Sequence, residues 1–100
     1  MWTDGRRLWR LVRREEFEKA WARAGQELTR PEAHMAAIER AIARDPLAVS
    51  FPTVDETQRI VRTIDPRDGL EIRVYFRIDE AAHECELGWV QLKPLESEPD

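Results

Sequence analysis

The chain has only one cysteine, Cys85, among its 100 residues, so it cannot form an internal disulfide. A shortage of cysteine is typical of proteins that fold in a reducing compartment. No apolar run approaches the roughly 20 residues that span a bilayer, and residues 1–7 lack the apolar segment of a signal peptide. Phosphate-binding loops, nucleophile elbows and helical zinc motifs are also missing. We therefore expect a small cytoplasmic domain with no membrane partner, no cofactor and no metal.

Lysine is scarce as well, because only two of the 16 basic residues are lysines, and the formal net charge is −4. Residues 1–50 hold ten Lys or Arg against eight Asp or Glu, whereas residues 51–100 hold six against twelve. A non-specific nucleic-acid binder gains its affinity mainly by neutralising phosphates, so the overall charge argues against that class. The negative overall charge is still compatible with a local basic site.

Residues 70–79 alternate apolar and polar side chains without interruption, which predicts a β-strand with two distinct faces. The apolar face carries Leu70, Ile72, Val74, Phe76 and Ile78, and the polar face carries Glu71, Arg73, Tyr75, Arg77 and Asp79. Two arginines around a tyrosine can bind phosphate, stack on a base or pair with carboxylates. The alternative is that Arg73 and Arg77 form cross-strand ion pairs with Glu84 or Glu86.

The other elements follow from apolar spacing and turn residues. We expect strands over residues 8–14, 59–65 and 84–92, helices over residues 15–27 and 31–44, and an irregular connection over residues 47–56. Thr29 is the predicted N-cap of the second helix, in a capping box with Glu32. Trp21 and Trp89 fall in the apolar phase of their segments and are predicted to lie in the core, as is Cys85.

The predicted fold class is α+β, in the order β-α-α-β-β-β, with an antiparallel sheet packed on one face against a helical hairpin. We expect residues 1–92 to form a single domain and residues 93–100 to form a flexible acidic tail.

Three segments carry a resemblance to a known family: Trp-Arg-Leu-Val-Arg at residues 9–13, Ala-Ile-Ala-Arg-Asp-Pro at residues 41–46, and Ile-Arg-Val-Tyr-Phe-Arg-Ile-Asp at residues 72–79. In the third, an arginine precedes an apolar-aromatic run and an Asp turn. Together with the predicted layout, they resemble the RelE/ParE toxin superfamily of bacterial toxin–antitoxin systems. The resemblance covers roughly residues 8–92 and implies the same fold, a toxin activity and an antitoxin protein as partner.

RelE-like members of that superfamily cleave mRNA in the ribosome, and ParE-like members poison DNA gyrase. The resemblance therefore implies RNA with the ribosome, or gyrase, as the target. It also implies that Arg73 stabilises a phosphate in nuclease members, and that Arg59 and Arg62 lie on the strand that carries further basic residues. Only one of these two can face Arg73, because they are three positions apart. Tyr75 and Arg77 join the candidate catalytic set through the alternation alone.

Nuclease members often supply a tyrosine, a histidine or a further basic group beyond the last strand. Here residues 91–97 offer only Lys93, so the sequence leaves ribonuclease activity open. Two hypotheses remain: a toxin that acts through the polar face of the central strand, or a non-catalytic protein-interaction module on the same scaffold.

Overall fold

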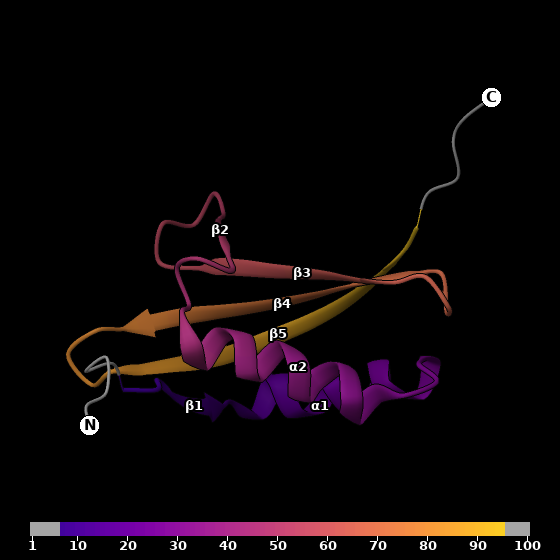
Figure 1. The fold of residues 1–100 in the computed structure, drawn as a ribbon, viewed down its shortest axis with the longest axis horizontal. Coiled ribbons are helices and arrows are strands. Elements are labelled where there is room, and N and C mark those ends of the chain that lie inside the picture. The colour runs from indigo at the N-terminus through magenta and orange to yellow at the C-terminus, as the bar shows by residue number, and fades with distance from the viewer. Residues whose placement is uncertain (1–6, 96–100) are drawn as a thin grey trace, which may run out of the picture.

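The computed structural model describes residues 7–95 and arranges them in two layers, with a five-stranded sheet and two helices along one side of it (Figure 1). The elements, in chain order, are β1 (Arg10–Arg13), α1 (Glu15–Ala24), the 3-10 turn η1 (Gly25–Glu27), α2 (Pro31–Arg44), β2 (Phe51–Pro52), β3 (Arg59–Asp65), β4 (Leu70–Asp79) and β5 (Glu84–Pro94). Neither helix is long and apolar enough to cross a membrane within residues 7–95.

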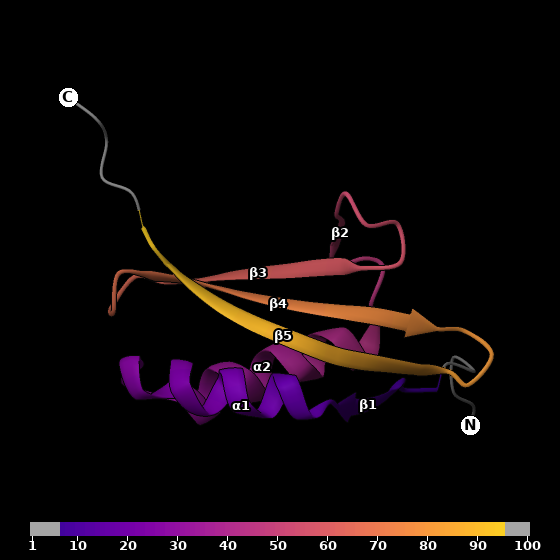
Figure 2. The same ribbon diagram turned by 180° about the vertical axis from the view of Figure 1, so that it is seen from behind.

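The strand order across the sheet is β1-β5-β4-β3-β2, and the predicted α+β class is confirmed. β3, β4 and β5 form an antiparallel meander, whereas β1 pairs in parallel with β5, so the sheet is mixed rather than wholly antiparallel. The direction of β1 explains this difference. α1 continues the course of β1 and α2 returns it, so the meander starts at the same end as β1 and its third strand runs parallel to it (Figures 1 and 2).

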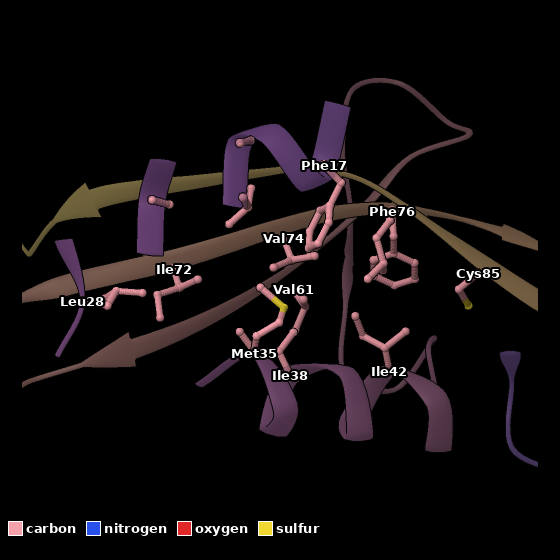
Figure 3. Close-up of a cluster of buried hydrophobic side chains, with 14 residues drawn as sticks. Phe17, Leu28, Met35, Ile38, Ile42, Val61, Ile72, Val74, Phe76 and Cys85 are labelled. Carbon is pink, nitrogen blue, oxygen red and sulfur yellow. The ribbon is translucent and has the colours of Figure 1, made fainter. Parts of the chain in front are cut away.

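The core lies between the helices and the apolar face of β4 (Figure 3). α1 contributes Phe17, Ala20 and Ala24, α2 contributes Met35, Ile38 and Ile42, and β4 contributes Ile72, Val74 and Phe76. The alternation over residues 70–79 thus becomes a strand whose apolar face is fully buried in its middle and partly buried at Leu70 and Ile78. Burying one such large apolar side chain stabilises the fold by about 1.5–3 kcal/mol.

Thr29 does not cap α2, and the predicted capping box is wrong. Arg30 occupies the N-cap position without a side-chain hydrogen bond. The backbone N–H of Thr29 donates to Oδ2 of Asp68 at 2.7 Å, and its hydroxyl donates to Oδ1 at 2.6 Å. A carboxylate in the β3–β4 turn is a stronger acceptor than local helix partners can offer. Thr29 therefore ties the connection between the helices to the sheet.

Other predicted boundaries also change, and the first helix ends at Ala24, where the 3-10 turn η1 begins, rather than at residue 27. The connection over residues 47–56 contains β2, which pairs with the first two residues of β3. β1 is shorter than predicted, while β5 extends through Lys93 and Pro94 because they pair with Glu71 and Leu70. These two residues of the predicted tail are therefore part of the sheet, and residues 96–100 lie outside the described residues.

A β-bulge in β5 reverses the predicted placement of Trp89. Phe76 pairs with Leu87 and Tyr75 pairs with Trp89, so Gly88 is an extra residue in β5. An extra residue shifts the alternation of the strand by one position. Trp89 consequently points away from the core and is 44% exposed, while its neighbour in the chain, Val90, is 3% exposed. Trp21, the other tryptophan predicted to be buried, packs against the core and is partly buried.

Candidate functional site

Both helices lie on one side of the sheet (Figures 1 and 2), and we call the opposite side the outer face. Register and alternation place these side chains on it: Ile60, Arg62 and Ile64 from β3, Glu71, Arg73, Tyr75 and Arg77 from β4, and Glu86, Trp89 and Gln91 from β5. Most of the polar residues that the sequence pattern singled out are therefore gathered on one surface.

The two arginines of β3 lie on opposite sides of the sheet. Arg62 is directly opposite Arg73 in the β3–β4 register and shares the outer face with it. Arg59 points to the helix side, where its Nε donates to Oγ of Ser50 at 2.6 Å and its Nη2 donates to the Ser50 carbonyl at 3.0 Å. Arg59 thus anchors the segment that carries β2, and the structure does not bring it together with Arg73.

Glu71 holds two of the outer-face arginines, Arg62 and Arg73, together. Nε of Arg62 donates to Oε2 of Glu71 at 2.7 Å, and Nε of Arg73 donates to Oε1 at 3.0 Å. Glu71 is 8% exposed although it lies on the uncovered face of the sheet. The alternation over residues 70–79 placed Glu71 on the polar face but indicated no role for it. Its position two residues before Arg73, on the same face, was the available signal.

The protonation of this cluster follows from its contacts. Burial acts to raise the pKa of Glu71, but hydrogen bonds and charge from Arg62 and Arg73 outweigh burial and hold the pKa below its usual value. Burial likewise acts to lower the pKa of Arg73, and Glu71 outweighs it, so that pKa is raised. Glu71 and Arg73 are therefore charged at neutral pH, and the carboxylate lies between two guanidinium groups. The cluster carries a net positive charge.

The remaining predicted site residues lie farther along β4. The hydroxyl of Tyr75 donates to Oε1 of Gln91 at 3.2 Å, and Tyr75 is paired across the strands with Trp89. Nη2 of Arg77 lies 3.9 Å from Oδ2 of Asp55. The alternative interpretation, in which Arg73 and Arg77 form cross-strand ion pairs with Glu84 or Glu86, is therefore wrong, because neither arginine is bonded to these glutamates. Arg73 instead contacts Glu71 in the same strand, and Arg77 lies near Asp55 in the loop before β3.

Other reactive groups lie outside the outer face. Nε2 of His34 is 2.8 Å from Oδ2 of the buried Asp65, and the ring of His83 stacks on Trp9 in the β4–β5 turn region. Cys85 is fully buried, and burial together with the charge of Glu84 raises the pKa of its thiol to about 11. Within residues 7–95, no three His, Cys, Asp or Glu side chains are grouped so that they could hold a metal ion.

Comparison of the sequence with known protein families gives no match, and comparison with curated proteins gives none either. Comparison of the structure does give one. The chain is similar to a chain of the toxin–antitoxin complex RelBE2 from Mycobacterium tuberculosis, with a TM-score of 0.66 and 19% identity, over 91% of this chain and 98% of that chain. The fold is RelE-like. The fold that the resemblance at residues 9–13, 41–46 and 72–79 implied is thus confirmed. At this identity the RelE-like fold alone does not assign a catalytic residue or a target.

Proposed function

We propose that the chain is the toxin-like component of a bacterial toxin–antitoxin pair and that it acts on RNA, free or in the ribosome, through the outer face. The observation that carries this proposal is the Arg62–Glu71–Arg73 cluster in the middle of that face. The RelE-like fold supports the toxin assignment, because the similar structure is a toxin in complex with its antitoxin.

The cluster is suited to hold a phosphate. Each arginine contacts Glu71 through Nε, and guanidinium groups have further N–H donors arranged to match phosphate oxygens. Because Glu71 fixes both side chains, less conformational entropy is lost when an anion binds. Next to the cluster, Tyr75 and Trp89 present aromatic rings on which an unpaired base can stack. Phosphate contacts and stacking together are typical of single-stranded RNA recognition.

The outer face is better equipped to bind RNA than to cleave it. Cleavage without a metal requires a base for the 2′-hydroxyl and an acid for the leaving oxygen. The carboxylate of Glu71 is engaged by two arginines, and the hydroxyl of Tyr75 is engaged by Gln91. Within residues 7–95 the outer face therefore supplies the phosphate-binding groups, and we propose that the protein acts by occupying RNA.

We further propose that an antitoxin protein covers the outer face. Ile64 is 59% exposed there and Trp89 is 44% exposed, which are large exposures for such side chains. Aromatic and aliphatic anchors of this kind commonly form the centre of a protein interface. The same two residues are also the specific observation in favour of the second candidate, a non-catalytic protein-interaction module.

Growth of bacteria that express the chain from a tightly controlled promoter tests the proposal. We expect the wild type to arrest growth with loss of protein synthesis, and Arg73→Ala to abolish the arrest while circular dichroism shows an unchanged fold. Arg40→Ala is the matched control, since it removes an exposed arginine from α2 on the other side of the sheet. It should arrest growth as the wild type does.

Three outcomes would contradict the proposal in different ways. Equal toxicity of the wild type and Arg73→Ala would show that Arg73 is not part of the functional site. Growth arrest with continued translation and loss of plasmid supercoiling would make gyrase the target in place of RNA. A non-toxic wild type that binds no RNA but forms a stable complex with the product of a neighbouring gene would establish the protein-interaction module.

A further inference from the structure

Arg77 and Glu86 are oppositely charged and face each other across β4 and β5, yet their side chains do not form an ion pair with each other. Directly opposed side chains of opposite charge ordinarily interact, since their Cβ atoms lie about 4.5–5.5 Å apart. Here Nη1 of Arg14 donates to Oε1 of Glu86 at 3.2 Å, and Nη2 of Arg77 lies 3.9 Å from Oδ2 of Asp55. Glu86 and Arg77 each interact with a residue outside β4 and β5, so no ion pair fills the space between them.

That space is a pocket of about 300 Å³ on the outer face, and its lining includes Tyr75, Arg77, Glu86, Gly88 and Trp89. The β5 bulge helps to form it. Gly88 contributes no side chain, and the register shift turns Trp89 outward next to Tyr75. Arg14 and Glu16 line it as well, so the pocket has two outer-face aromatic residues, two arginines and two glutamates around one volume. Aromatic walls with a few convergent polar groups are typical of sites for planar ligands.

We propose that this pocket binds a guanine base, a proposal that rests on the proposed action on RNA and names the base the site prefers. Guanine has acceptors at O6 and N7 and donors at N1 and the 2-amino group. Arg77 supplies donors for the acceptors, and Glu86 supplies an acceptor for the donors. Arg14 contacts Oε1 of Glu86, which leaves Oε2 for the base and keeps the carboxylate in place. The ring itself stacks on Tyr75 or Trp89.

The donor and acceptor pattern distinguishes guanine from the other bases. Adenine has an acceptor at N1, where guanine has a donor, so its N1 would face the carboxylate of Glu86 unfavourably. Cytosine likewise has an acceptor beside its amino group, and uracil has no amino group. Each of the other bases therefore matches the donors of Arg77 and the acceptor of Glu86 less completely than guanine does, which favours guanine.

Isothermal titration of the full chain with guanosine 5′-monophosphate and adenosine 5′-monophosphate tests the preference. We expect the guanine nucleotide to bind about tenfold more tightly or better, which is the range for one good bidentate base contact. Glu86→Gln should remove the preference, and Trp89→Ala should weaken binding of both nucleotides. Glu84→Gln is the matched control, because Glu84 also accepts from an arginine, Arg10 at 2.8 Å, but lies outside the pocket. It should keep the preference.

Equal affinity for the two nucleotides, no binding of either, or a preference that survives Glu86→Gln in the folded protein would overturn the proposal. Guanosine without phosphate separates this pocket from the proposed toxin activity. Arg73→Ala should retain the preference for guanosine over adenosine even though it abolishes growth arrest. If Arg73→Ala abolishes arrest but guanosine does not bind, the proposed function stands and the guanine pocket is wrong. If guanosine binds selectively but Arg73→Ala remains toxic, the pocket stands and the proposed function is wrong.

Discussion

The two faces of β4 have opposite chemistry although they alternate along the same ten residues. On the inner face, Ile72, Val74 and Phe76 are at most 1% exposed and pack against the helices. On the outer face, charged and aromatic side chains contact one another and no helix covers them. The inner face therefore provides stability through contacts that any close-packed core makes. The outer face is open to a ligand, and its one buried charge, Glu71, is compensated by neighbours.

This comparison predicts that the largest loss of stability comes from the inner face. Phe76→Ala removes a nearly fully buried ring from the centre of the core. We expect it to lower the free energy of unfolding by about 3–5 kcal/mol, because transfer and cavity terms add. Urea denaturation followed by circular dichroism measures this. Tyr75→Ala, on the outer face of the same strand, is the control and should cost clearly less. Similar losses for the two variants would contradict the division between the faces.

A smaller loss of stability is expected from a substitution at Glu71, which is buried although it lies on the outer face. Glu71→Gln keeps the size of the side chain but removes the charge that Arg62 and Arg73 share. We expect a loss of about 1–2 kcal/mol in the free energy of unfolding, because hydrogen bonds to a charged group are lost and two guanidinium groups remain close together. The same denaturation experiment measures it. A variant as stable as the wild type would show that the cluster is not held together by the carboxylate.

The smallest effect concerns pH. The pKa of Glu71 in the folded protein lies below its ordinary value of 4.5, owing to Arg62 and Arg73. Its contribution to stability is therefore fully present above about pH 4.5 and is lost as pH falls through the lower pKa of the folded state. We expect the stability of the wild type to fall more steeply below pH 4.5 than that of Glu71→Gln. Asp55 and Asp68 also have lowered pKa values in the wild type, and the substitution leaves both residues in place, so the difference between the two curves is the quantity to measure. Parallel curves would contradict the prediction.

How well the sequence predicted the fold depended on whether the pattern was local. β3 and β4 begin and end where alternation and the turn at residues 66–69 placed them. Thr29 was misplaced because its partner, Asp68, is far away in sequence, and a local capping rule cannot weigh such a competitor. The parallel pairing of β1 with β5 joins the two ends of the domain, and no spacing along the chain reveals it.

The candidate site shows the same limit. Alternation was sufficient to place Arg73, Tyr75 and Arg77 on one face and to show that only one of Arg59 and Arg62 could join them. It could not indicate which carboxylate each arginine would contact, since Glu71, Asp55 and Glu86 were all within the reach of flexible side chains. Nor could it place Trp89, because the bulge at Gly88 depends on the pairing with β4. The chemistry of the outer face was predictable, and its connectivity was not.

The bulge at Gly88 means that the make-up of the outer face depends on how β5 pairs with β4 as much as on the residues of β5. If Gly88 were paired regularly with Tyr75, with no bulge, every residue from Trp89 onward would exchange sides. Trp89 and Gln91 would then be directed at the helices, and Val90 and Leu92 at solvent. Loss of the bulge alone would thus undo the tryptophan–tyrosine pair without replacing either aromatic residue.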